Sequence, residues 1–265
     1  NPMVSWLCAN RLLACGLAVL VVGTAFYGFR EGRIRVKGHK SVTAVAMAAS
    51  SGATSATEAL QKLGPQAVPA LERMLRFRDR WSRDLILKSR PHLPRWMRER
   101  ATRWAGPPGE QVRIAGARAL GSLGPTASNA TPALVAATDS TGQLRWEAAK
   151  ALACIGAPAV PALRQALRTG PPGARHAAAY AIGEMKSAGS AAVPDLADVS
   201  QDPLASAELR TSAAFSLTLA GPDGVAALIR LRTNANPLVR SAALQALRAN
   251  PMAAAEGISR MQRRQ

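Results

Sequence analysis

Small and apolar residues recur at helical spacing between residues 41 and 250, and an arginine opens most of these segments. The shared pattern is Arg-x-x-Ala-Ala-x-x-Leu or a close variant of it. Its arginines follow one another at intervals of 32, 30, 35 and 30 residues: Arg113, Arg145, Arg175, Arg210 and Arg240. A pattern that repeats at a nearly fixed period predicts a stack of supersecondary units, each of which buries its apolar face against the next.

A second apolar segment follows each of these, and proline usually opens it. The openings are Val68-Pro69, Thr131-Pro132, Val160-Pro161 and Val193-Pro194. Proline at the first helical position loses no intrahelical hydrogen bond, and the glycines before it, such as Gly64 and Gly124, are typical helix stops. The period-two alternation of half-buried strands is missing from the repeats. We therefore predict an all-α fold, an α-solenoid (superhelix) of about six helical hairpins with one continuous core.

The arginine segments and the Pro-Ala-Leu openings resemble HEAT repeats, particularly the short HEAT-like repeats of phycobilisome lyase-type proteins. In that family an aspartate six residues before the arginine forms a ladder between neighbouring units. Asp139 has this spacing to Arg145, Asn234 takes the place before Arg240, and Asp202 lies eight residues before Arg210. The resemblance implies that a structural ladder, and not ligand contacts, is formed by Arg113, Asp139, Arg145, Arg175, Arg210 and Arg240.

Residues 12–29 carry no charged side chain, and their length is at the short end of what crosses a bilayer as a helix. Trp6 precedes this segment, and Phe26, Tyr27 and Phe29 end it, as in the aromatic belts of membrane interfaces. We predict a transmembrane anchor after an N-terminal segment, 1–11. A cleaved signal peptide and a buried core helix are the alternatives. Residues 30–40 form a basic juxtamembrane linker, which favours a single-pass protein with a cytoplasmic solenoid; export after signal cleavage is the alternative.

The formal net charge is +18, and most of it lies outside the regular repeats. The excess is found in residues 30–40, in residues 76–103 and in the tail, 251–265. Such clustering favours local contact with an anionic surface over a uniformly basic nucleic-acid groove.

The second of these basic clusters lies in an insertion of about thirty residues, at about 76–110, which doubles the usual interval between repeats. It contains Trp81, Trp96 and Trp104, and a basic amphipathic helix is predicted after Pro94. We predict that Trp81, Trp96, Arg98 and Trp104 contact a partner or an anionic membrane. The alternatives are that this segment packs on the neighbouring repeat or contacts nucleic acid or an acidic protein.

Residue patterns for catalysis, metal binding or cofactor binding are missing from the sequence. His39, His92 and His176 are isolated, and there is no phosphate-binding loop. Cys154 is expected to be a small buried residue. The best interpretation is a membrane-anchored, non-catalytic scaffold that binds a protein through its solenoid surface, without cofactor or small-molecule substrate. A nucleic-acid-binding HEAT-like protein is the first alternative, and the resemblance also allows an accessory protein similar to bilin lyases.

Overall fold

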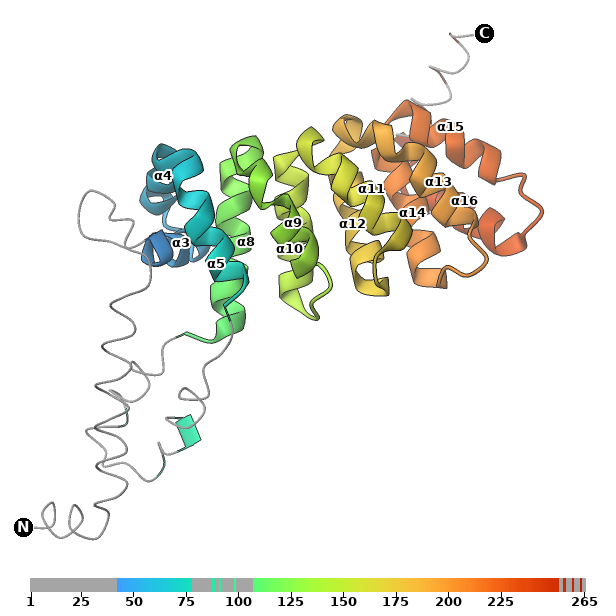
Figure 1. Cartoon of the computed structure of the whole chain (residues 1–265). Coiled ribbons are helices and arrows are strands. Elements are labelled where there is room, and N and C mark those ends of the chain that lie inside the picture. Colours follow the sequence, from blue (N-terminus) through green and yellow to red (C-terminus); the bar gives the residue numbers. More distant parts are fainter. Residues whose placement is uncertain are drawn as a thin grey trace, which may run out of the picture. The chain divides into compact units, whose positions relative to one another are not determined.

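The computed structural model describes residues 42–77 and 107–252, together with residues 87, 88, 91, 98, 255, 259 and 263. Within these ranges the chain is helical and contains no strand, so the expected all-α fold is confirmed. The chain divides into two compact units, and the repeats belong to the unit made of residues 42–77 and 109–265. The described helices of that unit form a row of packed pairs (Figure 1).

Five helices carry the arginine pattern, and we call them the arginine helices: α8 (Gly109–Leu123), α10 (Gln143–Ile155), α12 (Pro172–Glu184), α14 (Ala207–Leu219) and α16 (Pro237–Ala249). Five others are the proline helices: α5 (Val68–Leu75), α9 (Thr131–Ala137), α11 (Val160–Thr169), α13 (Val193–Gln201) and α15 (Pro222–Leu231). Each proline helix has proline at one of its first two positions. Helices α3 (Val42–Ser50) and α4 (Thr54–Leu63) precede them.

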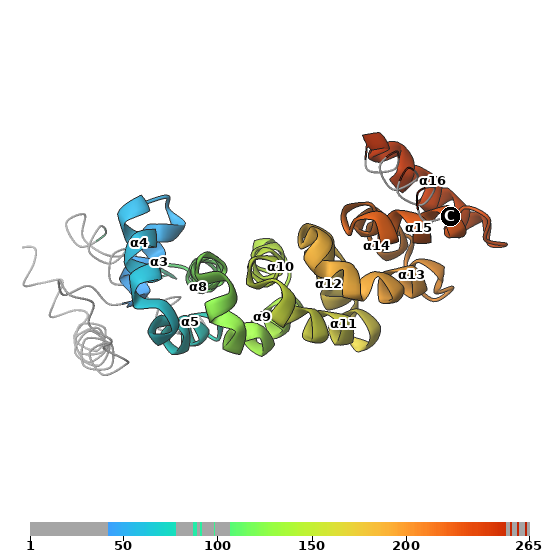
Figure 2. The ribbon, with the colours of Figure 1, turned by 90° about the horizontal axis from the view of Figure 1, so that it is seen from above.

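The hairpin of this solenoid is a proline helix followed by an arginine helix. Helix α9 packs closely on α10, α11 on α12, and α13 on α14, whereas α15 packs on both α14 and α16. The sequence pattern instead paired each arginine helix with the proline helix after it, and among the described helices close packing of that kind is found for α14 with α15. Short 3₁₀ segments make several of those connections: η1 (Gly64–Ala67), η3 (Gly124–Ala130), η4 (Ala157–Ala159) and η5 (Lys186–Ala192). The arginine helices also pack on one another, so α8, α10, α12 and α14 lie along one side of the row in Figure 2.

Leucines and doubled alanines fill the space between these layers. Leu120, Leu152, Ile182 and Leu217 are fully buried, one from each of four successive arginine helices. The alanine pairs are almost fully buried as well: Ala148 and Ala149, Ala177 and Ala178, Ala213 and Ala214, Ala242 and Ala243. Small side chains let neighbouring helix axes approach closely, which is why the pattern requires alanine at these positions.

Glycine ends several helices because the chain turns there with a positive φ. Gly64, Gly124, Gly156 and Gly221 have φ angles of 52°, 59°, 77° and 96°. At the equivalent place after α12 the sequence has Lys186, whose φ is 53°. A side chain is strained in this left-handed region, so the turn after α12 is formed at an energetic cost.

The insertion falls between the two helices of the first hairpin. Helix α8 packs on both α3 and α5, although about thirty residues separate α5 from α8 in the sequence. Trp81, Trp96 and Trp104 lie outside the described residues, as do the predicted membrane segment 12–29 and the linker 30–40. None of the helices in the described part is long and apolar enough to span a membrane.

One smaller expectation was wrong, because Cys154 is exposed. It lies on α10 between the buried Leu152 and Ile155. Since the buried positions of this helix recur every three or four residues, the position two after Leu152 turns outward.

Candidate functional site

The arginine of each later repeat binds backbone carbonyls of the segment just before its own helix, which for Arg175 is the last turn of α11 and for the others is a loop. The Arg145 Nε donates to the Ser140 carbonyl over 2.8 Å, and the Arg175 Nε donates to the Leu167 carbonyl over 3.0 Å. Backbone carbonyls of the corresponding loops accept from the other two: Arg210 Nη2 bonds Asp202 O and Ala205 O, and Arg240 Nη1 bonds Asn234 O and Ala235 O. The bond from Arg210 to the Ala205 carbonyl is buried and most of the others are partly buried, so these arginines satisfy backbone carbonyls that water reaches poorly.

Two of these arginines also contact the next hairpin. Arg175 Nη2 lies 3.1 Å from Asp202 Oδ2, and this ion pair joins the hairpin of α11 and α12 to the loop before α14. The backbone N–H of Leu204, together with Arg175, lowers the pKa of the Asp202 carboxyl. Arg145 lies against Gly173 at the start of α12, where an added Cβ would be 2.7 Å from Nη2. Asp139, predicted as a ladder member, is exposed, and among the described residues it is Asp202 that pairs with an arginine of the series.

The Nε of Arg113 is buried and has no hydrogen-bond partner, and the same is true of the Nε of Arg210. Arg210 nevertheless donates to two carbonyls through its Nη2. The insertion takes the place of the short loop whose carbonyls accept from the arginines of the later repeats. Arg113, Arg76 and Ser140 line a cavity of about 270 Å³ between α5 and α9.

Arg98, one of the predicted contact residues, is exposed, and its Nη2 donates to the Pro91 carbonyl over 3.3 Å. The three tryptophans predicted with it lie outside the described residues. Their role in contacting a partner or a membrane therefore stays a prediction.

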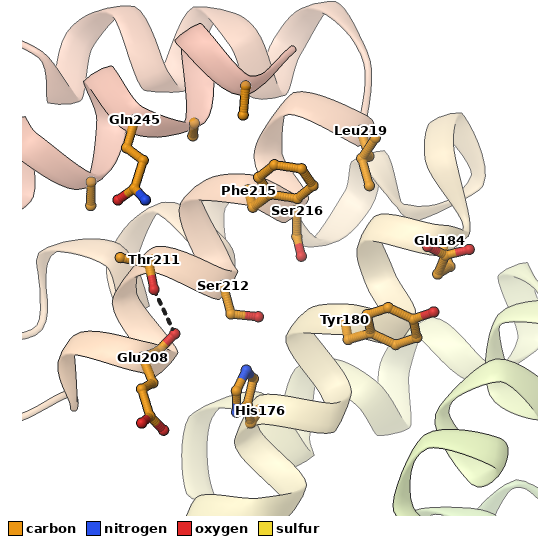
Figure 3. A pocket seen from close by; sticks show the side chains of 13 residues that line it. His176, Tyr180, Glu184, Glu208, Thr211, Ser212, Phe215, Ser216, Leu219 and Gln245 are labelled. Atoms are coloured by element: carbon orange, nitrogen blue, oxygen red, sulfur yellow. Dashed lines mark hydrogen bonds between the residues drawn. The ribbon is translucent and has the colours of Figure 1, made fainter.

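A larger groove lies on the face of the arginine helices, and the sequence interpretation missed it. Helices α12, α14 and α16 enclose about 440 Å³. Figure 3 shows the side chains that line this arginine-helix groove. They are His176, Tyr180, Glu184, Glu208, Thr211, Ser212, Phe215, Ser216, Leu219, Ala242, Gln245, Ala246 and Ala249.

A signal for this groove does exist in the sequence. Several lining residues stand one, five and nine positions after the arginine of their repeat. On α12 these are His176, Tyr180 and Glu184, and on α14 they are Thr211, Phe215 and Leu219. Residues four apart share one face of a helix, so each trio forms a stripe. Comparing the repeats at these three offsets would have identified the surface.

Aromatic side chains form the centre of the groove and one of its edges. The ring of Trp146, on α10, lies 5.5 Å from both His176 and Tyr180 in edge-to-face contacts. Such contacts stabilise an aromatic pair by about 0.5–1.5 kcal/mol beyond the area they bury. Trp146 is still 36% exposed, and Phe215 is 45% exposed. The groove therefore presents aromatic surface on side chains that their neighbours hold in place.

The charge of the lining is opposite to that of the chain. Lys and Arg outnumber Asp and Glu by 34 to 16 in the whole sequence. The lining contains Glu184 and Glu208 but neither lysine nor arginine. Both glutamates are exposed and lie toward different ends of the groove in Figure 3. The surface is therefore locally anionic.

The two ionisable rings of the groove respond to burial and to these acids. Burial lowers the pKa of His176, and Arg145 lowers it further, while Glu208 acts in the opposite direction. Burial also raises the pKa of Tyr180, and the negative charges of Glu184 and Glu147 add to that effect. At neutral pH the histidine is therefore an uncharged hydrogen-bonding group beside an acid.

The floor of the groove is set by close packing of α12 on α14. A Cβ added to Gly183 would lie 2.9 Å from the Ser216 Oγ and 3.1 Å from the Ser216 Cα. Contact this close requires glycine and leaves little freedom for the two helices to slide. Within the described ranges, no group of three or more His, Cys, Asp or Glu side chains could hold a metal ion. The arrangement is suited to binding side chains of another molecule.

Comparison with known proteins agrees with the repeat architecture. Residues 130–218 match the family of HEAT repeats. This match runs from the end of η3 through most of α14, so it includes the lining residues of α12 and α14 except Leu219. A search of the curated proteins finds no match. Among solved structures, human deoxyhypusine hydroxylase in complex with glycerol is 19% identical, with 88% of this chain and 97% of that chain covered. Its TM-score is 0.36, and we base no conclusion on it.

Proposed function

We propose that this chain is a non-catalytic scaffold of helical repeats that binds another protein through the arginine-helix groove. The observation that carries the proposal is the aromatic surface gathered there. Exposed apolar side chains are ordinary when scattered, but an apolar cluster rimmed by polar groups marks an interaction site. Phe215, Tyr180 and Trp146 form such a cluster, with Glu184 and Glu208 beside it.

The energetics of binding support this use of the groove. Each side chain that becomes ordered on association costs about 0.5–1.5 kcal/mol. Trp146 and Tyr180 already restrain each other through their edge-to-face contact. Tyr180 and Phe215 stand on adjacent helices that pack without room for an added methyl group at Gly183. Aromatic anchors in a fixed frame are the residues that typically dominate the affinity of protein interfaces.

The test compares partners recovered by the full chain with those recovered by two variants. Phe215→Ala removes an exposed ring from the groove. Leu204→Ala removes a side chain that is 91% exposed in the loop before α14, outside the groove, and serves as the matched control. Quantitative affinity purification should recover a partner with the wild-type chain and Leu204→Ala, and several-fold less of it with Phe215→Ala. A partner recovered equally with all three would argue against the groove.

Membrane anchoring through residues 12–29, with the solenoid on the cytoplasmic side, is a further part of the proposal and is supported by the sequence alone. Deleting residues 1–29 should move the expressed chain from the carbonate-resistant membrane fraction to the supernatant. If the intact chain is itself extracted by carbonate, the anchor is excluded. A mature N-terminus that begins after residue 25 would instead indicate export with signal cleavage.

A further inference from the structure

We infer that the groove accepts a cationic segment of its partner, in which two arginine or lysine side chains flank two apolar ones. This inference rests on the proposed function, and it adds the chemistry of the partner.

The ends of the groove are acidic, and the residues around them leave that charge available. Glu208 lies near His176, whose pKa it influences, at the end where α12 and α14 begin. Glu184 is the last residue of α12, at the other end. Arg145 is the cation that acts on His176, and its Nε is bound to the Ser140 carbonyl. A partner cation would therefore meet an acid at either end.

The spacing of the acids follows from helix geometry. Glu208 stands two positions before the arginine of its helix, and Glu184 stands nine positions after the arginine of α12, so the acids are eleven positions (2 + 9) apart along helices that begin at the same end. A rise of 1.5 Å per residue separates them by about 17 Å along the helix axes. Packed helix axes lie about 8–10 Å apart, so the whole separation is about 19 Å. An extended chain advances about 3.3 Å per residue, so its positions i and i+6 span about 20 Å. In a strand the side chains at i, i+2, i+4 and i+6 point to the same side. A segment of the form Arg-x-Leu-x-Leu-x-Arg therefore matches the groove in length and in facing.

The middle of the groove suits the apolar members of this pattern. Tyr180 and Phe215 stand between the two acids in Figure 3, at the same offset after their respective arginines. Their rings can cover leucine side chains and the methylene stems of the flanking arginines. A guanidinium or ammonium group within about 6 Å of a ring face gains further attraction. Ser212 and Gln245 can bond the backbone of an extended segment, whereas the Thr211 hydroxyl donates within its own helix and can only accept.

The test uses three labelled peptides of equal length with glycine on both sides of the core. The first contains Arg-Thr-Leu-Thr-Leu-Thr-Arg, the second contains Arg-Arg-Thr-Leu-Thr-Leu-Thr, and the third contains Gln-Thr-Leu-Thr-Leu-Thr-Gln. The second has the composition of the first but loses the spacing, and the third keeps the spacing but loses the charge. Fluorescence anisotropy with the full chain, at about 50 and 200 mM salt, should show the tightest binding for the first peptide and a decrease with salt.

Variants of the chain identify the groups responsible. An exposed ion pair contributes about 0.2–1 kcal/mol, so Glu184→Gln and Glu208→Gln should each weaken the first peptide by up to about fivefold. Both changes together should reduce its affinity to that of the third peptide, Gln-Thr-Leu-Thr-Leu-Thr-Gln. Glu58→Gln, which removes an exposed glutamate of α4 far from the groove, is the matched control and should have no effect.

Each result supports or overturns the inference. Equal affinity for the three peptides, no binding of any, or no effect of Glu184→Gln and Glu208→Gln overturns it. If Phe215→Ala then still reduces binding of a peptide or of the natural partner, the proposed function stands without the cationic specificity. A duplex DNA oligonucleotide that binds more tightly to the two glutamine variants would also overturn it, and would favour nucleic acid as the ligand of this face.

Discussion

Replacing Asp195 by alanine tests how a buried charge connects two proline helices. Asp195 lies in the first turn of α13, and its side chain is completely buried. Its two carboxylate oxygens pair with Arg164 and Arg168 of α11 in the preceding hairpin. At the equivalent position after the helix-opening proline, other repeats have alanine: Ala70, Ala133 and Ala162. Alanine therefore fits this backbone, and the variant removes the ion pairs without changing the fold.

The size of the effect depends on how well water can hydrate the two arginines once the carboxylate is removed. A hydrogen bond to a charged group stabilises by about 1.5–3 kcal/mol net. The side chains of Arg164 and Arg168 are 38% and 57% exposed, so both can be hydrated again after the carboxylate is lost. A fully exposed ion pair contributes about 1 kcal/mol at most, and the buried carboxylate of Asp195 should contribute more than that. The negative charge also interacts favourably with the N-terminus of α13, by about 0.3–1 kcal/mol. We expect Asp195→Ala to lower the free energy of unfolding by about 2 kcal/mol.

Urea denaturation of the full chain, followed by far-ultraviolet circular dichroism, measures this difference. Asp198→Ala on the same helix is the matched control, because Asp198 is exposed; a surface substitution of this kind changes stability by less than about 0.5 kcal/mol. The double variant Asp195→Ala with Arg164→Ala should be less destabilised than the sum of the two single variants, since both remove the same contact.

The reasoning is refuted if Asp195→Ala is as stable as the wild-type chain or more stable. That result would mean that removing the carboxylate from water costs as much as its two ion pairs return, as happens for some buried pairs. Full additivity in the double variant would show that Arg164 and Asp195 do not stabilise each other.

Three further predictions concern the helices around the groove. Lys186→Gly should raise the free energy of unfolding by about 0.5–1 kcal/mol, because glycine removes the strain of a positive φ and offsets part of that gain with its unfolded-state entropy; a loss of stability in urea would contradict this. Gly183→Ala should lower it by about 1–2 kcal/mol in the same assay, although alanine favours helix, because the methyl group would overlap Ser216. The pKa of His176 is lower in the folded chain than its ordinary value of 6.5, so its contribution to stability is complete above that value and is lost as the pH falls through the folded pKa. Between neutral and mildly acidic pH, the melting temperature should accordingly fall less steeply for His176→Gln than for the wild-type chain. Equal slopes would exclude His176 as a source of the pH dependence of stability.

The candidate site was only partly accessible to sequence reasoning. Trp81, Trp96 and Trp104 were chosen because aromatic residues in a basic insertion attract attention as a local pattern. Tyr180 and Phe215 form no local pattern, because they are 35 residues apart and lie in different helices. They become one surface only because α12 and α14 lie side by side with the same stripe facing outward.

Local chemistry, readable from the order of residues, determined which segments are helices and where they end. The arginine period, the prolines at helix starts and the glycines with positive φ each act within a few residues, so they are legible without a structure. Tertiary packing decided which proline helix pairs with which arginine helix, because an apolar stripe can be buried equally well against the helix before it or after it. Packing also decided that Asp195 is buried, that Cys154 is exposed and that Phe215 faces a groove. Burial depends on neighbours that are distant in the sequence, and no spacing along one helix contains that information.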